Sequence, residues 1–253
     1  MYNFEYQNPV KIIFGKGEIK NVGMNIPKGA KILLTYGGGS IFKNGVYDQV
    51  KASIENFTII EFGGIEPNPH YETLMKAVEV VKNENITYLL SVGGGSVLDG
   101  TKFIAAAALF TKGDPWQILS RHAPVLDAIP IGAVLTLPAT GSEMNGNSVV
   151  TKVETKEKLS FASLKVMPVF SILDPEVIFS LPEKQVANGI VDAFVHVECN
   201  YGVKWIDWRW SSAGLGESHD WARINCLSRY RPCPNSCNYS SWYYAHQTRT
   251  EKR

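Results

Sequence analysis

The stretch "ITYLLSVGGGSVLDGTKFIAAAALF" (86–110) joins a run of apolar residues to three glycines and a second apolar run. The first run predicts a buried strand over 86–92. The second predicts a helix over 96–110, with Ser96 as its N-cap and Asp99 at the capping-box position. Glycines let a backbone approach a ligand closely, and the free N–H groups of a helix N-terminus attract phosphate. A tight turn before a capped helix explains one such loop equally well.

A second glycine loop follows another apolar run, in "LLTYGGGS" (33–40). Two such loops at the ends of strands suit the two ends of a dinucleotide, which binds outside the carboxyl ends of parallel strands. The spacing differs from the GxGxxG fingerprint, because Leu98 occupies the position of the third glycine. The prediction of a nucleotide-binding edge therefore rests on the repeated glycine loops and not on the GxGxxG fingerprint.

Around these loops the chain alternates between predicted strands and helices. Further strands are predicted at 30–36, 57–62, 129–140 and 168–174, and a helix with apolar residues at helical spacing is predicted at 71–85. Strands that alternate with helices favour a mostly parallel sheet covered on both faces. The predicted fold class is α/β, with a Rossmann-like parallel sheet in the N-terminal part.

The overall composition is that of an ordinary globular protein, with 45% hydrophobic and 19% charged residues and a net charge of +1. This charge gives no global reason to expect nucleic acid or an anionic membrane as a partner. The first residues lack the features of a signal peptide, and no apolar run reaches the roughly 20 residues that span a bilayer. A cytoplasmic location is the resulting expectation.

The composition changes sharply after Glu198. All four cysteines, five of the six tryptophans and all arginines except Arg121 follow it. Residues 199–253 also show no clear helical or strand period. We therefore treat residues 1–198 and 199–253 as different in origin.

Four motifs in the first part occur in a familiar order: "FGGIEPNP", "SVGGGSVLDGTKFIAAAA", "LTLPATGSEMN" and "ANGIVDAFVH". Together they resemble the iron-containing (metal-dependent) alcohol dehydrogenases, in particular the NADPH-dependent aldehyde reductases and butanol dehydrogenases. The resemblance runs from near Met1 to about Glu198. It implies a dinucleotide-binding α/β domain (1–180), the start of a helical metal-binding domain (181–198) and an aberrant tail (199–253).

The resemblance also implies a set of cofactor-binding residues. One group would contact the pyrophosphate and the nicotinamide ribose: Gly94, Gly95, Ser96 and Asp99. A second would line the adenine and its ribose, with Lys158 reaching a ribose hydroxyl: Thr136, Thr140, Ser142 and Asn145. Taken without the motif, the two threonines and Ser142 are better explained by ordinary turn and cap chemistry.

A third group would lie near the adenosine 2′ position: Gly37, Gly38, Gly39 and Ser40. An acidic residue at this place would hydrogen-bond a free 2′-hydroxyl and repel a 2′-phosphate. The segment "TYGGGSIFK" (35–43) contains no acidic residue, and Lys43 is near. The expected cofactor is therefore NADP(H) rather than NAD(H).

Asp192 and His196 stand four residues apart in "LPEKQVANGIVDAFVHVE" (181–198), which predicts a helix with both side chains on one face. Alone, such a pair is more often an ordinary surface pair. The resemblance makes them the first two ligands of a divalent metal, Fe²⁺ or Zn²⁺, which acts as a Lewis acid on the oxygen of a small aldehyde or primary alcohol. Hydride would pass between the nicotinamide and the carbonyl carbon, so no catalytic side chain is implied beyond the metal site. A homodimer is compatible with this expectation.

The family supplies two further histidine ligands from its helical domain, and the tail lacks that pattern. Codons exist for residues 205–227 and 229–244 that, shifted by one base, encode apolar strings resembling the family's histidine-bearing motifs. We interpret 199–253 as the product of a deletion and a frameshift. Two ligands alone would bind a metal weakly, since water fills most of the coordination sphere.

Two alternatives to an active enzyme remain open at this point. One is a non-catalytic nucleotide-binding remnant. The other takes the tail at face value, with His219, Cys226, Cys233 and Cys237 as zinc ligands and its aromatic residues stacking on nucleic acid. The absence of a CxxC pair among these cysteines disfavours this second alternative.

Overall fold

The computed structural model describes residues 7–201, and among these the side chains of residues 196–201 are not described. The chain divides into two compact units, Met1–Leu181 and Pro182–Arg253, which are treated separately below. The predicted tail therefore lies outside the described residues, apart from 199–201. The three-part division of the sequence remains a prediction.

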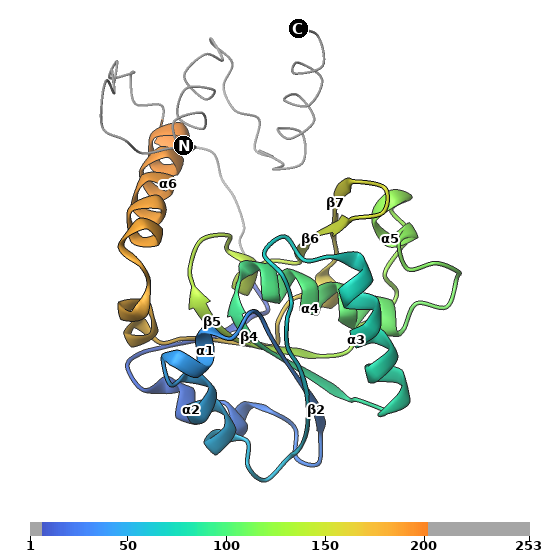
Figure 1. The fold of residues 1–253 in the computed structure, drawn as a ribbon, viewed down its shortest axis with the longest axis horizontal. Coiled ribbons are helices and arrows are strands. Elements are labelled where there is room, and N and C mark those ends of the chain that lie inside the picture. Colours follow the sequence, from blue (N-terminus) through green and yellow to red (C-terminus); the bar gives the residue numbers. More distant parts are fainter. Residues whose placement is uncertain (1–6, 202–253) are drawn as a thin grey trace, which may run out of the picture. The chain divides into compact units, whose positions relative to one another are not determined.

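Eight strands and five α-helices make up the described part of the first unit (Figure 1). The strands are β1 (Lys11–Phe14), β2 (Lys31–Tyr36), β3 (Thr58–Phe62), β4 (Tyr88–Gly94), β5 (Ile131–Leu137), β6 (Asn147–Lys152), β7 (Glu157–Ala162) and β8 (Phe170–Leu173). The helices are α1 (Ser40–Lys43), α2 (Val46–Ser53), α3 (Tyr71–Asn83), α4 (Gly95–Ala108) and α5 (Gln117–Ser120). Five short 3-10 helices complete the unit: Glu18–Asn21, Gly23–Asn25, Ser142–Met144, Leu164–Val166 and Pro175–Ser180.

Six of the strands form one sheet in the order β1-β8-β5-β4-β2-β3, and every neighbouring pair is parallel. The predicted α/β class with a parallel sheet is confirmed. The side chains of β2 alternate between the two faces: Leu33 packs with α3 and α4, whereas Ile32 and Leu34 pack with α2. Figure 1 shows α3 and α4 on one side of the sheet and α1 and α2 on the other.

The predicted strands and helices occur with small changes at their ends. Helix α3 ends at Asn83 rather than at 85, because Asn85 adopts a positive φ of 51° that a helix does not continue through. Strand β5 is shorter than the predicted 129–140, and helix α4 begins one residue before Ser96. The sequence did not predict β1, α1, α2, α5 or the antiparallel β6–β7 hairpin.

The predicted capping of α4 is wrong. The N-cap is Gly94, and it makes no side-chain capping bond. The Ser96 hydroxyl instead accepts a hydrogen bond from the backbone N–H of Asn68, 3.4 Å away, and Asp99 accepts bonds from other segments of the chain. These tertiary partners compete with the local capping pattern.

The described part of the second unit is helix α6 (Glu183–Tyr201). The backbone N–H groups of Gln185 and Val186 both donate to the carbonyl oxygen of Pro182, which directly precedes the helix. The helix continues three residues past Glu198, where the sequence pattern predicted a break. No helix among residues 7–201 is both long enough and apolar enough to cross a membrane.

Candidate functional site

The two glycine loops lie side by side at one edge of the parallel sheet. Strands β2 and β4 are neighbours, with Tyr36 opposite Val92. Gly37 therefore follows the end of β2 beside Gly93, which is the next-to-last residue of β4. From β2 the chain proceeds to β3 on one side, and from β4 it proceeds to β5 on the other. This reversal defines the topological switch point, where open α/β sheets bind ligands.

Glycine is required at this edge by close contacts. A Cβ on Gly95 would lie 2.4 Å from Oγ1 of Thr140, and a Cβ on Gly93 would lie 2.6 Å from Cγ2 of Val97. Gly38, by contrast, has no atom within 4 Å of the place where its Cβ would lie. The edge therefore contains tightly packed glycines that shape the backbone and one open glycine that faces free space.

The N-terminus of α4 follows directly from this edge. The helix has 14 residues and begins at Gly95, immediately after β4. The first N–H groups of a helix have no partner within the helix and carry the positive end of its dipole. The α4 N-terminus thus offers backbone donors and a partial positive charge to an anionic group.

Ser142 is the central residue of the loop that follows β5. Gly141, with a φ of 64°, turns the chain, and Ser142 is buried. Its hydroxyl donates to Oδ1 of Asp99 over 2.7 Å, and its backbone N–H donates to Oγ1 of Thr140 over 3.3 Å. The loop is thereby joined to α4 through a side chain on each.

Asp99 lies partly buried between this loop and the β6–β7 hairpin. Its Oδ2 accepts from the backbone N–H of Val149, 3.1 Å away, while Oδ1 accepts from Ser142. Burial raises the pKa of Asp99 above its ordinary value, against the hydrogen bond from Ser142 and the charge of Lys102. The carboxylate thus holds two other segments against α4.

A second chain of contacts connects the hairpin to the α4 N-terminus through Asn68. The Nζ of Lys158 on β7 donates to Oδ1 of Asn68 over 2.7 Å, and the Asn68 backbone N–H donates to Ser96. Burial lowers the pKa of Lys158, and the charge of Asp99 opposes this shift. Asn68 adopts a φ of 56°, and its place in "FGGIEPNP" was the signal that sequence reasoning left unused.

Lys102 is the functional candidate that the sequence interpretation missed. It is fully buried on α4, and its Nζ lies 2.7–3.2 Å from five oxygen atoms of Ser142, Asn145 and Asn147. Burial lowers the pKa of Lys102 to about 8, while Asp99 and Glu143 act in the opposite direction. The available signal was a lysine three residues after Asp99, directly before the apolar run of 103–108.

The remaining predicted cofactor residues lie at the same edge or close to it along the chain. Gly39 is the left-handed N-cap of α1, with a φ of 97°, and Ser40 is exposed at the first position of that helix. Thr136 is partly buried near the end of β5, and Thr140 is exposed in the loop beyond it. Their roles toward a cofactor remain predictions.

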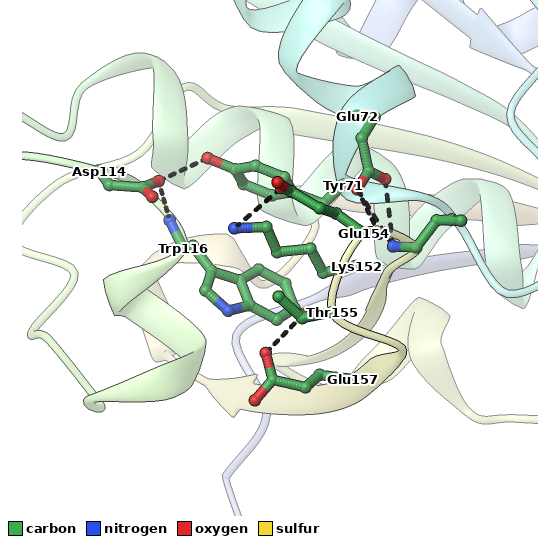
Figure 2. A network of polar contacts seen from close by, with 9 residues as sticks. Tyr71, Glu72, Asp114, Trp116, Lys152, Glu154, Thr155 and Glu157 are labelled. Carbon is green, nitrogen blue, oxygen red and sulfur yellow. Dashed lines mark hydrogen bonds and ion pairs between the residues drawn. The ribbon is translucent and has the colours of Figure 1, made fainter.

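The far end of the hairpin is held by a separate network (Figure 2). Glu72 on α3 accepts from the backbone N–H groups of Val153 and Glu154 at the hairpin turn, at 3.1 and 3.3 Å. The Nζ of Lys152 lies 5.4 Å from the ring centroid of Tyr71 and 5.8 Å from that of Trp116, within cation–π range. This network fixes the hairpin that carries Lys158.

Comparison with known proteins places the chain in a family. A model described as iron-containing alcohol dehydrogenase matches residues 9–175. The chain belongs to the iron-containing alcohol dehydrogenase family.

Individual members of this family are closely similar to the chain. It is 53% identical over 209 residues to the NADPH-dependent aldehyde reductase YqhD of Escherichia coli. This alignment covers 82% of this chain and 54% of that protein. It is 49% identical over 200 residues to the probable NADH-dependent butanol dehydrogenase 1 of Bacillus subtilis, covering 78% and 51%. The chain thus spans about half the length of these relatives.

Solved structures of family members are also similar to the chain. The crystal structure of Escherichia coli YqhD superposes with a TM-score of 0.75 at 53% identity, covering 81% of this chain and 53% of that one. The NADH-dependent butanol dehydrogenase A of Thermotoga maritima superposes with a TM-score of 0.75 at 46% identity, covering 79% and 51%. The parallel sheet and its glycine edge therefore belong to the fold of the iron-containing alcohol dehydrogenases.

The predicted metal ligands of this family lie on α6. Asp192 is exposed, and His196 follows one turn later on the same helix, so the helical spacing assumed from the sequence holds for the backbone. Among residues 7–195, whose side chains the structure describes, no three His, Cys, Asp or Glu side chains gather in a group that could hold a metal ion. The described residues therefore do not complete a metal site, and the assignment of Asp192 and His196 remains a prediction.

Proposed function

We propose that residues 7–181 bind NADP(H) across the edge formed by the ends of β2 and β4. We further propose that the protein transfers hydride between this cofactor and a small aldehyde or primary alcohol. The observation that carries the proposal is the pair of glycine loops at the switch point of a parallel sheet, one of which leads directly into α4. The names of two similar proteins, an NADPH-dependent aldehyde reductase and a butanol dehydrogenase, support the reaction class.

In this proposal the residues of the chain bind and orient the cofactor. The α4 N-terminus receives the pyrophosphate, and Gly94 and Gly95 allow the backbone to approach it. Thr140 and Asn145 face the cofactor from the loop after β5, and the buried Ser142 holds this loop against α4 through Asp99 and Lys102. The reduced nicotinamide supplies the hydride when the cofactor is bound.

A preference for NADP(H) over NAD(H) is proposed from the charge around the end of β2. No acidic residue occurs in 35–43, and Lys43 lies at the end of α1. Glu61 lies on the neighbouring strand β3, where its Oε1 accepts from Tyr47 at 2.8 Å and from Lys51 at 2.9 Å. Because a cation already pairs with this carboxylate, it repels a 2′-phosphate less than an unpaired carboxylate would.

We also propose Asp192 and His196 as ligands of a divalent metal, Fe²⁺ or Zn²⁺. Such a metal would polarise the carbonyl oxygen of the substrate. Two ligands on one helix leave most of the coordination sphere open, so this proposal requires further ligands from elsewhere. A homodimer is part of the same proposal.

Titration of the full 253-residue chain with NADPH and with NADH, followed by cofactor fluorescence, tests the binding step. We expect NADPH to bind more tightly than NADH. Equal affinity would contradict the cofactor preference, and the absence of binding by either would contradict the proposed site. Stoichiometric zinc uptake without NADPH binding would instead favour the zinc-binding tail.

Oxidation of NADPH by short aldehydes, with added Fe²⁺ or Zn²⁺, tests the reaction. Turnover that depends on the metal and is lost in Asp192→Asn supports the enzyme. NADPH binding without turnover at any metal concentration would contradict the reaction and leave the non-catalytic remnant as the function. Asp127→Asn provides a matched control, because Asp127 is an exposed aspartate of the first unit.

A further inference from the structure

Lys102 occupies a cage of oxygen atoms beneath the loop that follows β5. Three of its five acceptors are the backbone carbonyl oxygens of Ser142, Asn145 and Asn147, at 2.7, 2.8 and 3.0 Å. The other two are the Ser142 hydroxyl at 2.7 Å and Oδ1 of Asn145 at 3.2 Å. The side chain has no solvent-exposed surface, so a bound cofactor cannot touch it directly.

This cage determines the backbone conformation of the loop. Carbonyl oxygens from three positions between 142 and 147 converge on one cation, so the backbone of this segment is folded around the Nζ of Lys102. Buried polar groups without partners are costly, and removal of the ammonium group would leave these oxygens without their common donor. The loop conformation therefore depends on a charge at this point.

The cage is also connected to the α4 N-terminus. Lys102 and Asp99 lie three residues apart and so share one face of α4. The Ser142 hydroxyl accepts a hydrogen bond from Lys102 and donates one to Asp99. A continuous chain of hydrogen bonds therefore runs from the Nζ of Lys102 to the carboxylate of Asp99. Two predicted cofactor residues of the loop, Ser142 and Asn145, contact Lys102 directly.

We propose that Lys102 is a positioning residue, whose ammonium group holds the 142–147 loop in the conformation that receives the nicotinamide dinucleotide. This inference rests on the proposed function, since it assigns Lys102 to the cofactor site described there. In this proposal Lys102 contacts neither the cofactor nor the substrate.

The protonation state of Lys102 gives this role a pH dependence. A neutral amine has two N–H donors and a lone pair, which would face carbonyl oxygens in the cage. Burial lowers the pKa of Lys102 to about 8, against the charges of Asp99 on α4 and Glu143 on the loop. The charge of Lys158 on β7 acts to lower the pKa of Asp99, and burial lowers the pKa of Lys158 itself. The cage is therefore complete below about pH 8 and weakened above it.

Chemical rescue of Lys102→Ala in the full chain tests the proposal. We expect NADPH affinity to fall about tenfold or more, because the loop loses hydrogen bonds to a charged group. Hydrogen exchange of the backbone amides of 141–147, measured without cofactor, should accelerate. Propylammonium, which replaces the missing atoms and charge, should reverse both changes, whereas 1-propanol should reverse neither.

Lys112→Ala is the matched control, since Lys112 is an exposed lysine a few residues after α4. It should change neither readout. Unchanged exchange of 141–147 in Lys102→Ala would overturn the proposal, and so would equal rescue by propylammonium and 1-propanol. If the wild-type chain fails to bind NADPH, the proposed function fails, while the exchange experiment still reports separately on the cage.

The wild-type protein supplies a second test in case Lys102→Ala does not fold. NADPH affinity should decline above about pH 8, and exchange of 141–147, corrected for its intrinsic pH dependence, should rise over the same range. Lys158→Met should keep this alkaline decline if Lys102 causes it. Constant affinity and constant exchange between pH 7 and 10, or a decline that disappears in Lys158→Met, would overturn the proposal.

Discussion

At the residue scale, Gly38 offers the sharpest test of the cofactor preference. It is exposed, its Cβ position is open, and its φ lies outside the left-handed region, so a side chain can be added without strain. Gly38→Asp should weaken NADPH binding more than NADH binding, because a carboxylate repels a 2′-phosphate and can accept from a 2′-hydroxyl. The two dissociation constants give the measurement.

Gly38→Asn is the matched control, because asparagine has nearly the same shape without the charge. We expect the ratio of NADPH to NADH dissociation constants to rise about tenfold between the Asn and Asp variants, the effect of roughly 1.4 kcal/mol of repulsion. An unchanged ratio would show that the end of β2 does not face the adenosine 2′ position.

Individual residues also show where sequence reasoning ends. The sequence suggested local capping roles for Ser96 and Asp99, but their hydrogen bonds go to residues 28 or more positions away in the chain. Lys102 gave only a weak signal, because a buried lysine is recognisable only when its acceptors are known. Those acceptors lie 40–45 residues away.

At the scale of elements, the β6–β7 hairpin depends on α3. Burial raises the pKa of Glu72, but hydrogen bonds from the backbone N–H groups of Glu72 itself, Glu154 and Val153 outweigh it, so the pKa lies below its ordinary value. Glu72→Gln should lower the free energy of unfolding by about 1 kcal/mol and accelerate hydrogen exchange at the hairpin turn. Chemical denaturation and hydrogen exchange measure the two effects.

The pH dependence of this prediction follows from the direction of the shift. A lowered carboxylate pKa contributes stability that is present above the ordinary value of 4.5 and is lost as pH falls through the lower folded value. The difference between wild type and Glu72→Gln should therefore be full at pH 7 and shrink as pH falls below 4.5. Glu79→Gln, an exposed glutamate on the same helix, should behave as wild type at every pH. A difference that is constant with pH would contradict the role of the charge.

The hairpin was not predicted because its own sequence carries little information about it. Two strands alone are marginally stable in water. This pair is held by Val149 at Asp99, by Glu72 at the turn, and by Lys152 between the rings of Tyr71 and Trp116. None of these contacts is local in the sequence, so no short sequence pattern predicts them.

At the scale of the whole molecule, the parallel sheet separates two apolar clusters that share its central strand. Leu89 on β4 belongs to the cluster with α3 and α4, and Leu90 belongs to the cluster with α2. Both are fully buried. Leu89→Ala and Leu90→Ala should each lower the free energy of unfolding by about 2–5 kcal/mol, through lost burial and the cavity that remains.

Denaturant unfolding followed by circular dichroism checks this prediction. Since one strand supplies both residues, both variants should shift the same single transition of the first unit. Leu164→Ala is the control, because Leu164 is 82% exposed and should change stability by no more than about 0.5 kcal/mol. Two separate transitions, each moved by one variant alone, would show that the clusters fold independently.

The sequence by itself determined the α/β class, the two glycine loops and the family, because strand and helix periods and ordered motifs are local properties of the chain. Only the tertiary structure decided that β2 and β4 are neighbours, that Asp99 joins a loop and a hairpin to α4, and that a buried lysine sits inside the loop. Strand order and buried charge depend on partners far apart in the sequence.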